Sequence, residues 1–276
     1  MGKKILGIIV TYFPDKHLLI KNVEAISQYV DKLIIWENTT ENKESYRSIT
    51  GSNIEYYSDG SNVGISRALN FGWKYAQREG FDYLLTMDQD SCFINFQKYV
   101  MTCFSYTNDD SIVFGPLVTV NENEESLECI KELTGNQYII TSGMLVPIRI
   151  LNTIGGYCEA FMVDGIDVDF CIRVQDAGFK IFKNHNGVLL QHFGIPSVYK
   201  LLGKEYVCSN YSPFRYYGIL RNHIIIYRRS HRLYVKKLVK TYFLHYIPRI
   251  ILWENNKTKK LWNIAKGIKD GIQYKI

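Results

Sequence analysis

The first third of the chain alternates between short apolar runs rich in β-branched residues and longer segments with apolar residues at helical spacing. The short runs predict strands over residues 5–11, 32–36, 54–57 and 83–86. The longer segments predict helices over residues 16–29 and 66–78. This alternation is typical of βαβ units, so we expect a parallel sheet in this part of the chain.

The middle of the chain, from about residue 94 to residue 192, is less regular. Its patterns predict helices over residues 95–106 and 167–177, and strands over residues 112–120, 138–141, 143–147, 180–182 and 188–190. We therefore expect one α/β domain with a parallel front part and an antiparallel addition.

The last part of the chain is helical, basic and aromatic. Helices are predicted over residues 213–229 and 233–253, the second broken by Pro248. Residues 211–276 carry 15 lysines and arginines against two acidic residues, a net charge of +13, whereas the remainder carries −7. Twelve aromatic residues lie between these cations. Such a segment favours peripheral attachment to the inner leaflet of a membrane. An equally supported alternative, for residues 211–230, is packing on the catalytic body or on a second subunit.

Composition excludes several classes of protein. The 276 residues are 46% hydrophobic and 22% charged, with 20 glycines and 6 prolines, which excludes a disordered or collagen-like chain. The six cysteines form no CxxC pair and indicate a reducing compartment. We expect no signal peptide and no membrane span, and thus a cytoplasmic protein. Neither GxGxxG nor GxxxxGK[ST] occurs, so a dehydrogenase or P-loop enzyme is not expected.

Two carboxylates follow the predicted strand 83–86 directly. Asp88 and Asp90 stand two residues apart, so in extended backbone they point to the same side, where they can bind a hard divalent cation that holds a diphosphate. An Asp-rich turn is the ordinary alternative. His192 follows another apolar strand. Alone it is most simply a structural histidine, but together with the two aspartates it becomes a candidate metal ligand.

A second acidic cluster consists of Asp164, Asp167 and Asp169, followed by Arg173. Three carboxylates this close together repel one another unless a cation, a helix N-terminus or a proton-transfer role compensates. The alternative is a purely structural role, in which Asp164 or Asp167 caps a helix and Asp169 pairs with Arg173. Catalysis by one of the three remains compatible with that alternative.

Residues 61–70 combine a turn, a predicted helix N-terminus and Arg67. The free N–H groups of a helix N-terminus bind phosphates. The alternative is a capped surface helix with Arg67 exposed.

Taken in order along the chain, these motifs resemble the inverting glycosyltransferases of family 2, which have the GT-A fold. The matching segments are residues 9–12, 34–38, 62–72, 87–91 and 164–170, with His192. The Asp-Gln-Asp-Ser and Asp-x-x-Asp-x-Asp forms resemble the rhamnosyltransferase branch in particular. The resemblance implies an α/β GT-A catalytic domain over residues 1–205, whose mostly parallel central sheet is flanked by helices. Residues 206–276 are then a helical extension.

The resemblance also implies roles for individual residues. Contacts to the nucleotide base and ribose are implied for Thr11, Glu37 and Arg67, with Asn62 nearby, although the family usually has aspartate where this chain has Glu37. Asp88 is expected near the ribose and diphosphate and beside the metal, Mn²⁺ or Mg²⁺, which Asp90 and His192 ligate. Asp167 corresponds to the catalytic base.

The implied reaction moves a sugar from a nucleotide donor to a saccharide or lipid-linked saccharide in bacterial surface polysaccharide synthesis. The donor is expected to be dTDP-rhamnose, with a UDP-sugar as the alternative. The expected partners of the extension are the inner membrane surface or a second copy of the chain, and nucleic acid is not expected. Two other functions fit the sequence less well. A sugar-nucleotide nucleotidyltransferase needs a Gly-rich N-terminal loop with a catalytic arginine and lysine, which residues 11–15 lack. A nucleic-acid-binding protein would use the basic tail but leaves the carboxylates without a purpose.

Overall fold

The computed structural model describes residues 2–39, 47–107, 109–121, 129–134, 137–191 and 196–276. The chain forms two compact units. The first comprises Met1–Ala160 and Ile166–His192, and the second comprises Phe161–Gly165 and Phe193–Ile276. The main division, between residues 192 and 193, lies before the expected boundary at 205/206. The second unit also includes the short internal segment Phe161–Gly165.

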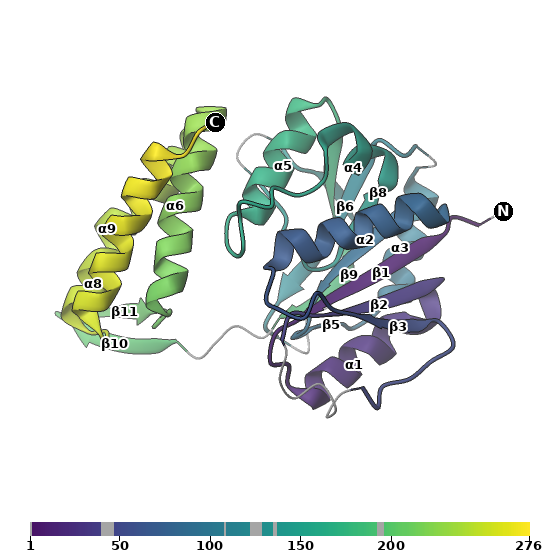
Figure 1. The fold of residues 1–276 in the computed structure, drawn as a ribbon, viewed down its shortest axis with the longest axis horizontal. Coiled ribbons are helices and arrows are strands. Elements are labelled where there is room, and N and C mark those ends of the chain that lie inside the picture. The colour runs from purple at the N-terminus through teal and green to yellow at the C-terminus, as the bar shows by residue number, and fades with distance from the viewer. Residues whose placement is uncertain (1, 40–46, 108, 122–128, 135–136, 192–195) are drawn as a thin grey trace. The chain divides into compact units, whose positions relative to one another are not determined.

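The first half of the sheet is parallel, as the alternating pattern predicted (Figure 1). Its strands lie side by side in the order β3 (Ile54–Tyr57), β2 (Lys32–Glu37), β1 (Ile5–Thr11) and β4 (Tyr83–Asp88). β1 is buried along its whole length, which explains its continuous run of apolar residues. β4 extends two residues beyond the predicted end, so that Asp88 belongs to the strand, but Gln89 and Asp90 form a turn. The extended backbone expected from Asp88 to Asp90 therefore ends at Asp88, and the alternation of a strand does not place the two carboxylates on one side.

The second half of the sheet is mixed and contains the expected antiparallel addition. The order continues with β8 (Met144–Pro147), β6 (Ile112–Thr119), β9 (Lys180–Gln191) and β5 (Ser91–Phe93), and β7 (Ile130–Glu132) also pairs with β9. β8 is antiparallel to β4, and β6 is parallel to β9. The two strands predicted over 180–182 and 188–190 are parts of the single strand β9.

The strand predicted over residues 138–141 is wrong, because these residues form no strand. Ile139 is nevertheless buried, and its side chain covers Gly115, where an added Cβ would lie only 2.8 Å from Ile139 Cδ1. The segment is therefore apolar because Ile139 is buried against β6, and not because it pairs with a strand.

Helices cover both faces of the sheet (Figure 1). α1 (Lys16–Ile26) and α3 (Phe96–Tyr106) pack on one face in a common apolar core. α2 (Ile65–Glu79) packs on the other face through Gly72, where a Cβ would lie 2.9 Å from Ile8 Cδ1. α4 (Ile148–Ile154), which was not predicted, and α5 (Ile166–Asp176) complete the first unit.

The second unit contains a β-hairpin and four α-helices in the described residues. The hairpin is formed by β10 (Ser197–Leu201) and β11 (Lys204–Cys208). The helices are α6 (Pro213–Ser230), α7 (Leu233–Thr241), α8 (Ile247–Leu252) and α9 (Lys257–Gln273), with a π-helical turn at Tyr242–Tyr246.

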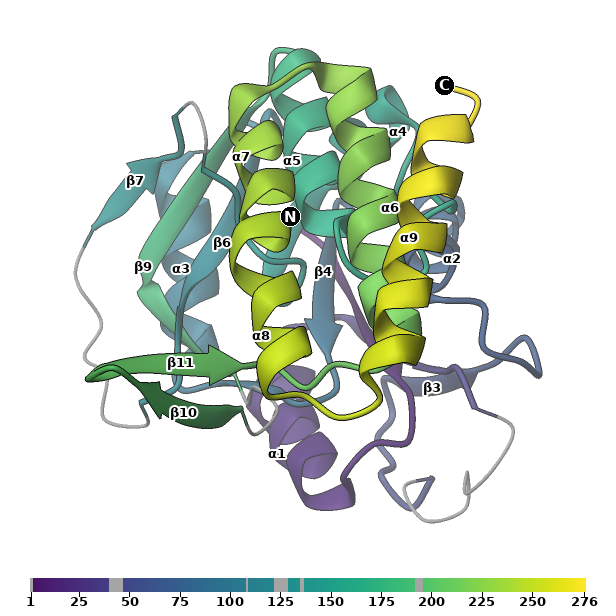
Figure 2. The same ribbon diagram turned by 90° about the vertical axis from the view of Figure 1, so that its left-hand side faces the viewer.

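Helices α6 and α9 lie side by side (Figure 2). Their close approach requires Gly267, because a Cβ there would lie 2.5 Å from Tyr217 O. The chain is not broken at Pro248 itself: the irregularity is the π-helical turn, and the helix continues from it into α8, where the proline stands in the first turn and needs no intrahelical N–H donor. No helix in the described part of the chain has the length and apolar character needed to cross a membrane.

Candidate active site

The parallel half of the sheet brings three of the predicted residues to one edge. In the strand register, Thr11 at the end of β1 stands opposite Glu37 at the end of β2, and Val10 stands opposite Asp88 at the end of β4. The carboxyl ends of parallel strands are where α/β proteins bind ligands. Thr11 itself is fully buried and its hydroxyl donates a hydrogen bond to Trp36 O at 3.0 Å, so its side chain holds β1 to β2.

Glu37 is fully buried and ion-paired. Arg47 Nε lies 3.0 Å from Glu37 Oε1, and Arg47 Nη2 lies 2.6 Å from Glu37 Oε2, which is a bidentate pair. The Arg47 side chain is 48% exposed, and its guanidinium lies 6.0 Å from the ring centroid of Tyr56. Sequence reasoning missed Arg47, because it lies in a polar segment with no periodic pattern. At this strand end the arginine, and not the glutamate, is accessible to solvent.

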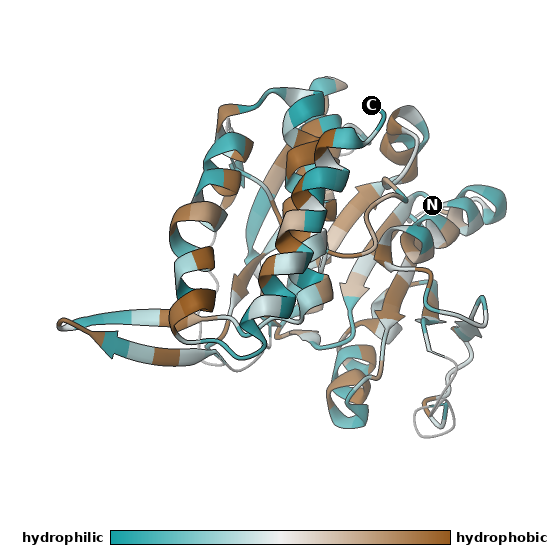
Figure 3. Ribbon diagram, turned by 60° about the vertical axis from the view of Figure 1, so that its left-hand side comes forward, coloured by the Kyte–Doolittle hydropathy of each residue, from teal (hydrophilic) through white to brown (hydrophobic). Residues whose placement is uncertain are grey.

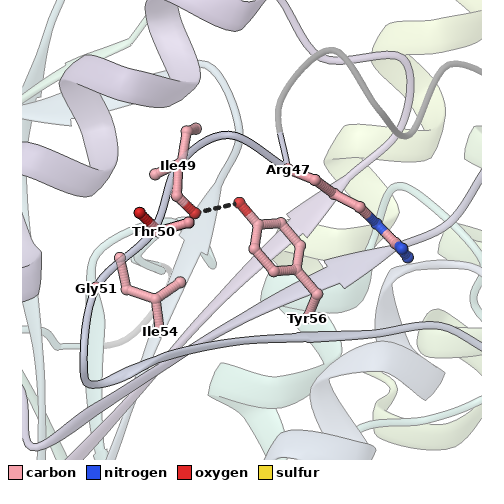
Figure 4. Close-up of a pocket in the computed structure, with 6 residues that line it drawn as sticks. All are labelled: Arg47, Ile49, Thr50, Gly51, Ile54 and Tyr56. Atoms are coloured by element: carbon pink, nitrogen blue, oxygen red, sulfur yellow. Dashed lines mark hydrogen bonds between the residues drawn. The ribbon is translucent and has the colours of Figure 1, made fainter.

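Arg47 also borders a pocket beside the edge strand β3 (Figure 4). The pocket has a volume of about 350 Å³ and is lined by Arg47, Ile49, Thr50, Gly51, Ile54 and Tyr56. Its shape is stabilised by the Tyr56 hydroxyl, which donates a hydrogen bond to Ile49 O at 2.8 Å. The pocket thus combines an apolar wall with one cation.

Hydrogen bonds of the Asp88 backbone and of the Gln89 side chain hold the Asp-Gln-Asp segment in place. Asp88 N donates to Ser142 Oγ at 3.0 Å, and Asp88 O accepts from Asn22 Nδ2 at 2.7 Å. Gln89, to which the sequence assigned no role, accepts from Tyr12 N at 2.5 Å and donates to Tyr12 O at 3.0 Å. The amide of Gln89 therefore joins the loop after β4 to the loop after β1.

The same segment lies against the end of β9. β5 is antiparallel to β9, and Ser91 stands opposite Gln191. Gln191 Nε2 donates to Asp88 Oδ2 at 3.4 Å. Within the described residues, Gln191 Oε1 and Ser91 Oγ are buried without a hydrogen-bond partner. His192 follows Gln191 directly but lies outside the described residues.

These oxygen atoms decide whether a divalent cation fits here. Mg²⁺ and Mn²⁺ prefer carboxylate, carbonyl and hydroxyl oxygens. Half-buried Asp88 and Asp90 supply carboxylates, and the unsatisfied oxygens of Ser91 and Gln191 are of the right kind. The donor set fits such a cation, although the described residues contain no group of three histidine, cysteine or acidic side chains that could hold a metal.

The turn before α2 is tied to the end of β2. Asn38 Oδ1 accepts from Val63 N at 3.2 Å, and Asn62 Oδ1 accepts from Gly64 N at 3.0 Å. Gly64 precedes α2 with φ 81°, and no side chain caps the helix. Ser66 Oγ is buried without a partner among the described residues, and Arg67 is exposed. The first turn of α2 therefore has the free N–H groups and the cation that favour an anion.

The second acidic cluster separates into three environments. Asp169 is 3% exposed and pairs with Arg173 at 2.8 Å, so the structural alternative is confirmed for this residue. Asp164 belongs to the second unit, where Arg215 holds it with Nε and Nη2 each 3.1 Å from a carboxylate oxygen. Asp167 is half-buried in the first turn of α5, and its Oδ1 accepts from Val168 N at 2.9 Å.

The chain was compared with protein-family models, with curated proteins and with solved structures. No protein-family model matches it. The dTDP-rhamnosyl transferase RfbF of Shigella flexneri is 22% identical over 289 residues, which cover 99% of this chain and 97% of that protein.

Two solved structures are similar in fold. A crystal structure of GalNAc-T7 with UDP, GalNAc and Mn²⁺ has a TM-score of 0.62 at 12% identity and covers 98% of this chain, which spans 56% of that protein. S. aureus TarS 1–349 in complex with UDP-GlcNAc has a TM-score of 0.57 at 13% identity, and the match covers 97% of this chain and 81% of that one.

The fold is the GT-A fold, as expected. Together with the full-length similarity to RfbF, it supports a glycosyltransferase enzyme.

Proposed function

We propose that this chain is a metal-dependent, inverting glycosyltransferase of family 2. It moves rhamnose from dTDP-rhamnose to a saccharide or lipid-linked saccharide in the synthesis of a bacterial surface polysaccharide, and a UDP-sugar is the alternative donor. The observation that carries the proposal is the similarity to a dTDP-rhamnosyl transferase over 99% of this chain and 97% of that protein. The convergence of Glu37, Asp88 and Thr11 at one sheet edge supports it.

The nucleotide is proposed to lie along the ends of β1, β2 and β4. Because Glu37 is fully buried, it acts through Arg47, whose half-exposed guanidinium can donate to a carbonyl of the base. Arg67 and the first turn of α2 offer positive charge to the donor, and Asn62 shapes the turn that leads to them. Thr11 supports this edge by holding the two strands together.

Asp88, Asp90 and His192 are proposed to hold Mn²⁺ or Mg²⁺. The bound ion would supply Lewis-acid stabilisation of the charge that develops on the leaving nucleoside diphosphate. Gln89 fixes the loops on both sides of this site, so the two aspartates keep their orientation.

Asp167 is the proposed catalytic base. Its carboxylate would remove the proton from the attacking hydroxyl of the acceptor, and one base on one face of the sugar gives inversion at the anomeric carbon. The neighbouring acidic residues are compensated by arginines: Asp169 by Arg173, and Asp164 by Arg215. Their charges therefore contribute less repulsion to Asp167 than the sequence alone implies.

Residues 206–276 are proposed to attach the protein peripherally to the cytoplasmic face of the membrane, with contact to a second copy as the alternative. Residues 211–276 carry 15 lysines and arginines but only two acidic residues. This net positive charge supports an anionic surface as the partner.

The proposed function is tested with a panel of nucleotide sugars that includes dTDP-rhamnose, a UDP-sugar and a GDP-sugar. We expect dTDP-rhamnose with Mn²⁺ to raise the melting temperature most and to be slowly hydrolysed, because a ligand that binds only the folded state stabilises it by about 2.7 kcal/mol at a hundred times its Kd. EDTA should abolish both effects. The proposal is refuted if no nucleotide sugar stabilises the folded protein with or without metal.

A further inference from the structure

The hairpin of the second unit has one face fixed by the helices. In its register Tyr199 pairs with Tyr206, and both rings pack on Trp253, with centroid distances of 5.6 and 5.0 Å. Arg249 Nη1 also donates to Val207 O at 2.9 Å. A two-stranded hairpin alone is only marginally stable in water, so these contacts are what hold it in a defined position.

The remaining surface of the hairpin is apolar and exposed. Val198 and Val207 pair across the strands on the face opposite the tyrosines, and they are 54% and 45% exposed. Leu201 is 45% exposed, and Leu202 at the turn is 93% exposed. Figure 3 shows hydrophobic colour at the turn of the hairpin, which extends to the left in that view.

Leu202 is unfavourable in its own turn. The loop between β10 and β11 has two residues, Leu202 and Gly203, with φ of 50° and 75°. Positive φ at both positions defines a type I′ turn, for which Asn-Gly is preferred, and a leucine in the left-handed region is disfavoured. Neither burial nor turn preference explains a leucine here. A strained and fully exposed apolar residue points to contact with something outside the chain.

The charge around the hairpin indicates what that contact is. Residues 197–276 contain 17 lysines and arginines against 3 acidic residues. Lys200 and Lys204 flank the turn on the two strands, and Lys200 pairs with Glu205 at 3.2 Å on the exposed surface of the hairpin. Two of these basic surfaces would repel each other in a symmetric contact, whereas an anionic phospholipid surface attracts one and accepts the apolar tip.

We propose that the β10–β11 hairpin is a membrane-docking element that inserts Leu202, with Leu201 beside it, into the interfacial region of an anionic phospholipid bilayer. Lys200 and Lys204 then lie at the level of the headgroups. The inference rests on the proposed peripheral attachment and names the segment responsible for it, the hairpin 197–208, which lies mostly before the proposed extension 206–276.

Leu202→Asn separates docking from folding. Asparagine suits the positive φ at this position, so the substitution preserves the turn and removes only the apolar tip. The matched control is Leu233→Asn, which changes a leucine of α7 that is 71% exposed. Co-sedimentation of the full chain is measured with phosphatidylcholine vesicles that contain or lack phosphatidylglycerol, without any nucleotide sugar.

We expect the wild type to bind vesicles that contain phosphatidylglycerol, with weaker binding at high salt. Leu202→Asn should lower the partition coefficient about tenfold, since it removes one inserted leucine, and Leu233→Asn should leave it unchanged. Equal binding of wild type and Leu202→Asn overturns the hairpin proposal while the attachment stands. Absence of wild-type binding overturns both. A change of oligomeric state in Leu202→Asn, without a change in vesicle binding, assigns the hairpin to a protein interface instead.

Discussion

A buried ion pair in the second unit allows a quantitative prediction. Lys260 Nζ lies 2.7 Å from Glu254 Oε2, and the two side chains are 6% and 1% exposed. Tyr216 Oη and Asn210 N donate to Glu254 Oε1 at 2.9 and 3.2 Å. Lys260→Met removes the cation and leaves the carboxylate buried with these two neutral donors. Breaking such a pair from one side destabilises by about 3–5 kcal/mol, and the remaining donors favour the lower end of that range.

The double variant Lys260→Met/Glu254→Gln is the decisive comparison. A glutamine oxygen can still accept from Tyr216 and Asn210, and no charge is left buried, so we expect the double variant to lie within about 1.5 kcal/mol of the wild type. Hydrogen exchange of peptides from α6 and α9 measures the opening free energy of the second unit directly. The reasoning is refuted if Lys260→Met alone is as stable as the double variant.

Two further predictions concern the proposed base and a buried histidine. Asp167→Asn should lower kcat about 10²- to 10⁴-fold at saturating donor and acceptor, with an unchanged melting temperature, and full retained activity would exclude Asp167 as the base. Burial lowers the pKa of His223 below its usual 6.5, although the hydrogen bond between its Nδ1 and Ile219 O at 2.8 Å and, to a smaller extent, the charge of Asp164 oppose this. Folding therefore favours the neutral ring, so stability should be complete above about pH 6.5 and fall as the pH drops below it. In His223→Gln, melting curves between about pH 7.5 and about pH 5 should show a smaller loss, and an unchanged slope would contradict the assignment.

Local sequence patterns predicted the parallel half of the sheet well, because each βαβ unit carries its own alternation of apolar runs and amphipathic segments. They failed where burial and pairing are not local. Ile139 is buried over Gly115 without joining a strand. The hairpin was missed because its apolar residues face outward and its pattern includes three charged residues.

The sequence predicted that Asp88 follows an apolar strand, but it did not predict the residues that contact the strand ends. Asp88 is placed by a strand whose pattern is clear, and its contact with Gln191 spans 103 residues. Arg47 pairs with Glu37 across a polar segment, and Gln89 binds the backbone of Tyr12, 77 residues earlier. No spacing rule connects such residues, because their proximity results from the order of strands in the sheet.

The segment before Asp167 shows that the C-terminal extension is more than an appendage. Asp164 is held by Arg215, and Asn222 Nδ2 donates to the carbonyls of Val163 and Asp164, both at 2.9 Å. Residues 161–165 therefore pack with α6, although the chain on either side of them belongs to the first unit. Since Asp164 is only three residues before Asp167, the peptide that leads into the proposed base is anchored at one end by α6. The expected boundary at 205/206 placed residues 161–165 in the catalytic domain, whereas these contacts group them with α6.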